Sequence, residues 1–528
     1  MGVKLAKQIS ESLQYYHLPE FDPSWRSVKR GLEKESLRIL PDGNISTSSH
    51  PKVLGAALTN PFITTDFSES LLEFITPAYA DIDECLQVLE NVHRFTFQNL
   101  ENDEMLWVSS MPCPLDSDAD IPIAQFGDSN IGKMKTLYRQ GLSNRYGSLM
   151  QVIAGLHYNF SMPESFWAPY QKICGHEGSI QDFRTEKYLH LIRNFHRYSW
   201  LLIYLFGASP AACKCFGQGR EHDLGELDSD SLYLPHATCL RMGNLGYKSE
   251  AQKSLFVCYN DLDSYAQCLE KAMHTPYPDY ESIGQKRDGE YIQLNTNLLQ
   301  LENEFYSTVR PKRVAISGER PLDALTSKGI EYIEVRALDL NPYLPLGIDA
   351  QQIRFLDSFL VHCLLDESPE CHQTEFFEVA KNLASVVEHG RNPDLELSLD
   401  SKPRKLVQWA SELLEDISFS SALLDGENSD LHELSRLAQI AKVENPDLTP
   451  SGRMLKDMQE QGMSFFEFSM NQSKIQKQTL TNGELGTETV EIMHKTAADS
   501  IAKLAEIEAA DAATKISFDK FLAKWNQS

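Results

Sequence analysis

Residues 29–40 read KRGLEKESLRIL and run directly into Pro41-Asp42-Gly43, which is a turn signal. A run of this length before a tight turn indicates a strand, and we expect a short second strand at residues 44–47. Further strand signals lie in the first two-thirds of the chain, at residues 70–76, 155–160, 291–301 and 330–340. Helical segments fall between them without a regular βαβ alternation. This pattern predicts an α+β architecture built on an antiparallel sheet.

Helices are expected where apolar residues recur at helical spacing. In residues 84–98, for example, Leu86, Leu89 and Val92 lie on one side of the expected helix. The other expected helices are residues 1–13, 187–206, 351–365, 403–414 and, as a solvated helix, 497–512, with surface loops at 216–232 and 389–403. The sequence has no G-x-G-x-x-G or Walker A loop, so a bound nucleotide must be held by other groups.

Composition narrows the class of function. The chain has 528 residues and a net charge of −26, from 75 acidic and 49 basic residues. This acidic balance argues against partners that are nucleic acids or anionic membranes. The ten cysteines form no C-x-x-C pair, and no apolar stretch approaches the ~20 residues that span a bilayer. Because no targeting segment is visible, we expect a cytoplasmic protein with reduced thiols and no structural zinc.

Several expected strands carry polar residues two positions apart, and such side chains share one face of a strand. These pairs are Glu33 with Glu35, His157 with Asn159, Asn295 with Asn297, and Glu334 with Arg336. Glu73 lies in the apolar run LLEFI, where a carboxylate needs a partner or a metal ion. If the strands share one sheet, one face would present Glu33, Glu35, Glu73, His157 and Glu334. Mg²⁺ prefers such oxygen ligands, and the histidine would also suit Mn²⁺.

A simpler interpretation is that these polar positions form the wet face of an antiparallel sheet. Glu33 and Glu35, however, share their strand face with Leu37 and Ile39, so that face is not uniformly polar. Clustered carboxylates also repel one another unless cations offset their charge. The spacing by itself indicates a Mg²⁺-dependent enzyme that handles phosphate groups, and it leaves the wet-face interpretation open.

Short motifs follow one another from residue 30 to residue 336. They read RGLEKESLR (30–38), TTDFSESLLEF (64–74), LWVSSMPC (106–113), KTLYR (135–139), NRYG (144–147), GLHYNF (155–160), YLFGASP (204–210), ENEFY (302–306), RPKR (310–313) and GIEYIEVR (329–336). Each motif is modestly specific, but together and in this order they closely resemble the proteobacterial glutamate–cysteine ligases, or γ-glutamylcysteine synthetases. The resemblance covers roughly residues 30–346, and beyond about residue 360 only helical character remains.

The resemblance implies a fold similar to glutamine synthetase, in which a curved antiparallel sheet forms a funnel surrounded by helices. It implies one functional unit over residues 1–528, with a sheet-containing catalytic core at 20–346 and a mainly helical part at 347–528. We expect the chain to act as a monomer.

The resemblance also implies a reaction. ATP, with Mg²⁺, would phosphorylate the γ-carboxylate of L-glutamate, and the amine of L-cysteine would attack the γ-glutamyl phosphate. The products would be γ-glutamylcysteine, ADP and phosphate, in the first step of glutathione biosynthesis. The chemistry suits the residues, because a carboxylate is a poor electrophile and phosphoryl transfer depends on positioning and charge neutralisation.

By the same resemblance, Glu35 and Glu73 would share one metal ion, while Glu33, His157 and Glu334 would hold the others. Arg336 would face the transferring phosphoryl group as the catalytic residue, because the arginine fork suits such anions. An ordinary ion pair between Arg336 and Glu334 or Asp339 is the alternative.

The substrate pocket is likewise implied by resemblance. For cysteine it comprises Phe67, Tyr138, Arg139, Leu142, Gln151, Arg241, Tyr247 and Tyr306, with either Arg139 or Arg241 gripping the carboxylate of the amino acid. Arg310, Lys312 and Arg313 form a basic cluster that would contact the phosphates of the nucleotide, with plain surface solvation as the alternative.

Three other functions fit parts of this pattern. Another ATP-dependent carboxylate–amine ligase would differ only in the pocket for the acceptor amine. A two-metal phosphohydrolase would use the same carboxylates but would hydrolyse ATP without glutamate. A non-catalytic sensor of glutamate or nucleotide would have little need of so many metal ligands.

Overall fold

The computed structural model describes residues 23–115, 117–246, 249, 251–253, 255–316 and 319–526. The expected helix at residues 1–13 and the pocket residue Tyr247 lie outside these ranges. Among the helices that are described, none combines the length and the apolar character that crossing a membrane requires.

The central element is a seven-stranded sheet in the order β11-β12-β5-β1-β3-β2, with β4 also paired to β1. Every strand pair in it is antiparallel, as the sequence predicts. The strands are β1 (Lys29–Ile39), β2 (Ile63–Thr65), β3 (Leu71–Ile75), β4 (Met105–Leu106), β5 (Leu156–Ser161), β11 (Val309–Lys312) and β12 (Tyr332–Leu338). The long strand β1 therefore lies near the middle, between β3 and β5.

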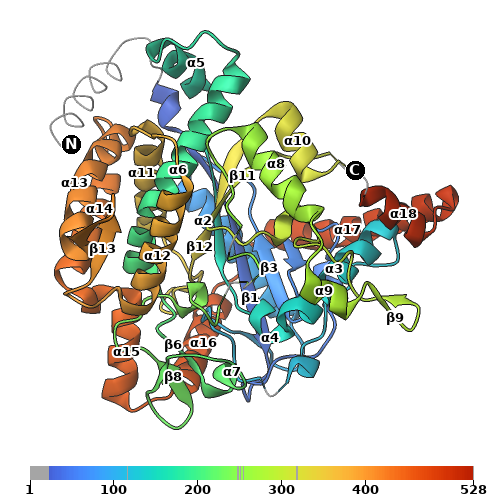
Figure 1. Ribbon diagram of the computed structural model, residues 1–528. Coiled ribbons are helices and arrows are strands. Elements are labelled where there is room, and N and C mark those ends of the chain that lie inside the picture. The colour runs from blue at the N-terminus through green and yellow to red at the C-terminus, as the bar shows by residue number, and fades with distance from the viewer. Residues whose placement is uncertain are drawn as a thin grey trace.

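Helices surround this sheet on both sides (Figure 1). Those that precede residue 347 are α2 (Ile82–Asn99), α3 (Asn130–Tyr146), α4 (Ser148–Gln151), α5 (Glu164–Ile173), α6 (Ile180–Phe206), α7 (Lys214–Gly217), α8 (Leu262–Met273), α9 (Pro278–Ile283) and α10 (Pro321–Lys328). The later ones are α11 (Ala350–Leu365), α12 (Gln373–His389), α13 (Leu406–Asp425), α14 (Leu431–Glu444), α15 (Pro450–Gln461), α16 (Phe465–Thr481), α17 (Thr487–Thr514) and α18 (Phe518–Trp525). Figure 1 shows α6 and α11 to α14 on one side of the sheet and α3 and α18 on the other.

The face of β1 that carries its even-numbered residues packs against helices. Arg30 Nη2 lies 3.0 Å from Asp357 Oδ2 of α11, and Tyr158 of β5 donates to Asp357 Oδ1 at 2.6 Å. Lys34 Nζ lies 2.8 Å from His93 Nε2 of α2, and burial lowers the pKa of Lys34 to about 7. Because strand side chains alternate, the odd-numbered residues Glu33 and Glu35 point the other way.

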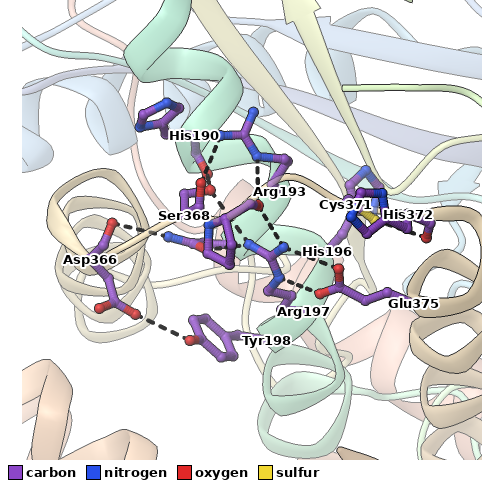
Figure 2. Close-up of polar contacts among 12 residues, drawn as sticks. His190, Arg193, His196, Arg197, Tyr198, Asp366, Ser368, Cys371, His372 and Glu375 are labelled. Carbon is purple, nitrogen blue, oxygen red and sulfur yellow. Dashed lines mark hydrogen bonds and ion pairs between the residues drawn. The ribbon is translucent and has the colours of Figure 1, made fainter. Parts of the chain in front are cut away.

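The later helices are tied to the core by polar contacts from α6, which Figure 2 shows. Arg197 Nε lies 2.5 Å from Glu375 Oε1 of α12. Arg193 Nη2 donates to the backbone oxygen of Ser368 at 2.9 Å, and Tyr198 donates to Asp366 Oδ2 at 3.1 Å. Arg193 and Arg197 thus fix the connection between α11 and α12 from one side of α6.

Several expected elements differ from the structure. Residues 291–301 are not a continuous strand: β10 (Glu290–Tyr291) pairs with β9 (Lys286–Arg287), and Asn297 forms one isolated bridge with Pro276. The amide side chains beyond it bond locally instead, since Asn295 Oδ1 accepts from Asn297 N at 3.0 Å. Residues 44–47 contribute only one bridge, between Ile39 and Ile45.

The expected loops contain short strands. The loop at 389–403 contains a hairpin of β13 (Glu396–Leu399) and β14 (Lys402–Lys405), so the expected helix at 403–414 begins later, as α13. The loop at 216–232 contains β7 (Gly225–Glu226) and enters β8 (Ser231–Tyr233), which pairs with β6 (Ala211–Cys213). The helices expected at 84–98, 187–206, 351–365 and 497–512 are confirmed as parts of α2, α6, α11 and α17.

Candidate active site

A cavity of about 350 Å³ lies over the face of the sheet that carries Glu33 and Glu35. The strands β1, β3, β5, β11 and β12 form its floor, and α3 forms one wall. The candidate residues that line it are Glu33, Glu35, Phe67, Glu73, Tyr138, Arg139, Leu142, Gln151, His157, Tyr306, Arg310, Lys312, Glu334 and Arg336. Most of the residues singled out from the sequence therefore meet in one place.

Strand register explains why the acidic residues converge. Glu35 of β1 is paired directly with Glu73 of β3, and Glu33 is paired with His157 of β5. Glu334 of β12 is paired with Asn159, two residues beyond His157 along β5. Paired residues in adjacent strands project to the same side of a sheet, so four strands place their polar side chains in the cavity.

His157 is at the centre of this acidic group. Its Nδ1 lies 3.2 Å from Glu33 Oε2 and 3.5 Å from Glu334 Oε1, and its Nε2 lies 3.7 Å from Glu35 Oε1. Glu33, Glu73 and His157 each offer a ligand atom, and these atoms all lie within 4.8 Å of one another. Two carboxylates and an imidazole at this separation can hold one divalent cation.

The four carboxylates have different electrostatic surroundings. Burial raises the pKa of Glu35, and burial together with the charges of Glu33, Asp66 and Glu35 raises the pKa of Glu73 well above its usual range. For Glu33, burial is outweighed by the hydrogen bond to His157, and the pKa is lowered. The ionised form is therefore disfavoured at Glu35 and Glu73 and favoured at Glu33.

At Glu334 the effect of neighbouring cations on the carboxyl pKa outweighs the effect of burial. Its Oε2 lies 3.1 Å from Lys312 Nζ, and its Oε1 lies 3.0 Å from Arg336 Nη1. Burial alone would raise the pKa of Glu334, but these cations and His157 hold it well below the usual range. Arg336 thus forms an ion pair with Glu334, whereas Asp339 accepts from the Ser209 hydroxyl at 2.6 Å.

A second part of the cavity is bounded by α3. The Arg139 side chain donates to the backbone oxygen of Asp66 and lies 4.3 Å over the ring of Phe126. Gln151 Nε2 donates to the Tyr306 hydroxyl at 3.1 Å. With the buried Phe67 and Leu142, these groups form an enclosure that is part apolar and part polar, suited to a small amino acid.

Two arginines from the sequence analysis lie outside the cavity wall. Arg241 is buried and donates through Nη2 to the backbone oxygen of Arg336 at 2.9 Å, so it supports the backbone of β12, and its charge lowers the pKa of the nearby Glu35 against the effect of burial. A Cβ on Gly155 would come within 2.0 Å of that same Nη2, which shows how closely the strand and the guanidinium pack. Arg313 lies 3.5 Å from Glu331 and donates to the backbone oxygen of Lys328 at 3.1 Å, away from the cavity.

The cavity also contains side chains that the sequence analysis did not single out: Asp66, Ile131, Met134, Lys135, Leu301, Glu302, Asn303, Pro321 and Trp525. Asp66 and Lys135 lie inside motifs that were recognised, so their place in those motifs was an available signal. Trp525 gave no signal, because it lies in a segment where only helical character is visible.

Comparison with known proteins identifies the family. A family model described as glutamate-cysteine ligase matches residues 16–386. The chain belongs to the glutamate–cysteine ligase family. A glutamate–cysteine ligase of Pseudomonas putida is 49% identical over 507 residues, which is 96% of each chain. One from Azotobacter vinelandii is 50% identical over 95% of each chain.

Solved structures agree with this assignment. A crystal structure of the glutamate–cysteine ligase of Francisella tularensis in complex with AMP has a TM-score of 0.88 and 37% identity, over 95% of this chain and 97% of that one. A bifunctional glutathione synthetase of Pasteurella multocida has a TM-score of 0.69 and 25% identity, over 87% of this chain and 53% of that one.

These findings confirm the family, the α+β fold and the ligase activity predicted from the sequence. The chain is a ligase that synthesises γ-glutamylcysteine, the first step of glutathione biosynthesis.

Proposed function

We propose that this cavity transfers the γ-phosphoryl group of ATP to the γ-carboxylate of L-glutamate and then admits the amine of L-cysteine to the activated carbon. The observation that carries this proposal is the convergence of Glu33, Glu73 and His157 with Lys312 and Arg336 in one cavity. Phosphoryl transfer needs metal ions and cationic side chains that position the phosphate groups and neutralise their charge. Carboxylates that can bind metal ions, beside an arginine and a lysine, suit such a reaction. The products would be ADP, phosphate and γ-glutamylcysteine.

The chain has residues that fit divalent metal ions. Glu33, Glu73 and His157 would hold one ion, and Glu35 and Glu334 lie beside them for others. The raised pKa of Glu73 supports this assignment, because crowded carboxylates are relieved by a cation. Bound Mg²⁺ would supply charge neutralisation for the phosphates, and His157 makes Mn²⁺ an acceptable substitute.

Arg336, Lys312 and Arg310 would contact the phosphates of ATP. Glu334 lies between Lys312 and Arg336 and holds both head groups in place through the ion pairs at 3.1 and 3.0 Å. Arg310 Nη2 donates to the backbone oxygens of Asn303 and Phe305, both at 2.7 Å, so the protein itself fixes the orientation of its guanidinium. A preorganised cationic wall stabilises developing phosphate charge with little rearrangement.

The acceptor amino acid would lie against α3. Phe67, Tyr138, Leu142 and Tyr306 would enclose its side chain, and Gln151 would orient the Tyr306 hydroxyl. Of the arginines considered for the carboxylate of cysteine, Arg139 lines the cavity, whereas Arg241 contacts the backbone of Arg336. We therefore assign the carboxylate to Arg139 and a supporting role to Arg241.

We further propose that residues 1–528 act as a single monomeric unit in the cytoplasm. The contacts of α6 through Arg193 to the segment between α11 and α12, and through Arg197 to α12, support a continuous unit. No disulfide joins any of the ten cysteines, which supports a reducing compartment.

The test measures the products with purified protein, ATP, Mg²⁺ and L-glutamate, with and without an acceptor. We expect ADP, phosphate and γ-glutamylcysteine with L-cysteine, nearly as good a reaction with 2-aminobutyrate, and poor use of glycine or amines without a carboxylate. Release of AMP and pyrophosphate would contradict the acyl phosphate. ATP hydrolysis that does not depend on glutamate would favour a phosphohydrolase.

Arg139→Ala tests the acceptor site, with Arg313→Ala as its control outside the cavity. In Arg139→Ala the apparent KM for cysteine should rise far more than the apparent KM for ATP. In Arg313→Ala both KM values should stay as in wild type. Equal changes in the KM values for cysteine, glutamate and ATP would mean that Arg139 does not bind the acceptor.

A further inference from the structure

The final helix of the described chain reaches the catalytic cavity. Trp525, in the last turn of α18, lines this cavity and also a small polar cavity of about 30 Å³ beside it. Leu301 and Glu302 line both cavities as well. In Figure 1, α18 lies against α3, on the side of the sheet away from α11 to α14. A side chain from the end of the chain thus forms part of the active-site wall.

The position of α18 is held by apolar packing. Leu522 is buried against Met134 and Leu137 of α3 and against Leu294. The rings of Phe518, Phe521 and Trp525 follow one another along the helix with centroid separations of 6.4 and 6.2 Å. One apolar face of α18 therefore covers α3, the helix that carries Tyr138 and Arg139 into the cavity.

Polar contacts hold the same arrangement from outside. Asp519 Oδ1 accepts from the Tyr291 hydroxyl at 2.7 Å and from Lys286 Nζ at 3.1 Å. At the start of α3, Asn130 donates through its backbone nitrogen to Asp511 Oδ2 at 2.5 Å and through Nδ2 to the Ile516 oxygen at 3.2 Å. The end of α17 and the whole of α18 thus pack against α3 and its neighbours. These contacts fix the position of Trp525.

The wall near Trp525 differs chemically from the cavity floor. Ile131, Met134, Leu301 and Pro321 line the cavity on this side together with Glu302, whereas the clustered carboxylates lie on the sheet. An apolar wall that includes a large ring excludes water from the space beneath it. The proposed chemistry needs such exclusion, because water competes with the amine of cysteine for the activated carbon.

We propose that Trp525 is a positioning residue of the active site, which closes the cavity over γ-glutamyl phosphate and keeps water from it. This inference rests on the acyl phosphate of the proposed function. In the productive step the amine nitrogen bonds to the γ-carbon and loses a proton, the bond from that carbon to the phosphate oxygen breaks, and phosphate leaves with the proton as hydrogen phosphate. In the wasteful step a water oxygen attacks the same carbon, and glutamate and phosphate result. Only the first step forms the dipeptide.

The ratio of phosphate released to γ-glutamylcysteine formed therefore reports on Trp525. The experiment uses full-length protein with ATP, Mg²⁺, glutamate and cysteine, and compares wild type with Trp525→Ala and Trp525→Phe. We expect a ratio near one for wild type, a rise of roughly two-fold or more for Trp525→Ala, and rescue by the aromatic ring of Trp525→Phe. Lys524→Ala, an exposed neighbour on the same helix, is the control and should behave as wild type.

A second measurement does not depend on turnover. The remaining tryptophans are buried in the core, so ligand entering the cavity should alter mainly the emission of Trp525. Titration with ADP and Mg²⁺ should change the fluorescence of wild type and not that of Trp525→Phe. If Trp525→Ala does not fold, this comparison decides the question by itself.

An unchanged ratio in folded Trp525→Ala overturns the inference. If Trp525→Ala does not fold, a fluorescence change in Trp525→Phe as large as that of wild type overturns the inference. Failure of wild type to form the dipeptide with ADP and phosphate would instead contradict the proposed function, so the two failures are distinguishable.

Discussion

Glu73→Gln should make the metal-free protein more stable while it removes activity. Glu73 lies close to Glu33 and His157, and burial and the neighbouring carboxylates raise its pKa well above the usual range. In the absence of a cation, its negative charge opposes folding. Glutamine has nearly the same size and no charge, so the substitution removes the repulsion without opening a hole.

The magnitude follows from the separation of the charges. Two carboxylate oxygens within 4.8 Å repel by roughly 3 kcal/mol at an effective dielectric constant of about 20. Protonation and solvent relieve part of this repulsion. We therefore expect the free energy of unfolding of metal-free Glu73→Gln to exceed that of wild type by about 1–2 kcal/mol at pH 7.

The sign of the pH dependence follows from the raised pKa. A carboxyl group whose pKa is higher in the folded state destabilises the fold at neutral pH, where the unfolded chain is ionised. The penalty disappears below the ordinary carboxyl pKa of 4.5, where Glu73 is protonated in both states. The advantage of Glu73→Gln should therefore be present at pH 7 and absent near pH 4.

The assay is urea denaturation followed by circular dichroism, first with EDTA and then with millimolar Mg²⁺. Mg²⁺ should stabilise wild type and should stabilise Glu73→Gln much less, because a ligand has been lost. Glu69→Gln is the control from the same motif. Glu69 accepts backbone hydrogens from His50 and Gln125, both at 2.6 Å, so its replacement should lower stability in both conditions.

The reasoning is refuted if Glu73→Gln is no more stable than wild type in EDTA and if Mg²⁺ stabilises both equally. Such a result would mean that Glu73 is a solvated carboxylate on a wet sheet face.

Three further predictions concern other parts of the molecule. Arg336→Lys should lower turnover on the order of 10²-fold in a steady-state assay, because lysine keeps the charge but loses the planar fork; an unchanged rate would indicate a purely structural ion pair. Glu104→Gln should lower the free energy of unfolding by about 3 kcal/mol in urea titrations, since it leaves the buried Arg38, now 3.0 Å from Glu104, without its counter-charge; a loss below the experimental error would contradict this. Burial lowers the pKa of Lys442 to about 8 from the usual lysine value of 10.5. Lys442→Met should therefore raise the free energy of unfolding by about 1 kcal/mol below pH 8, and this gain should vanish towards pH 10.5. Thermal unfolding across this pH range checks the size and the sign of the effect.

The floor of the candidate active site could be predicted from the sequence because it depends on local geometry. Side chains alternate along any strand, so Glu33 and Glu35 must share a face wherever β1 lies. The same rule placed Glu334 and Arg336 on one face of β12. In the structure Glu33, Glu35, Glu334 and Arg336 all line the cavity. The rule failed for Asn295 and Asn297, because amides that bond their own backbone compete with strand formation.

The role of individual arginines was beyond this reasoning. Arg139 and Arg241 are equivalent as sequence letters, and both are cations in recognised or nearby segments. Only packing separates them: Arg139 lines the cavity, whereas Arg241 donates to the backbone of β12 and lies close against Gly155. Burial of a side chain depends on residues far away in the chain, which no local pattern contains.

The sequence by itself determined the acidic pairs, the antiparallel character of the sheet and, through ordered motifs, the family. Tertiary structure alone decided that β1 lies between β3 and β5, so that Glu35 meets Glu73 and Glu33 meets His157. It also decided that α18 returns to α3 and places Trp525 in the cavity wall. The physical reason is the range of the interactions: side-chain alternation is set within a few residues, whereas strand order and helix docking are set by apolar surfaces that meet only when the whole chain has folded.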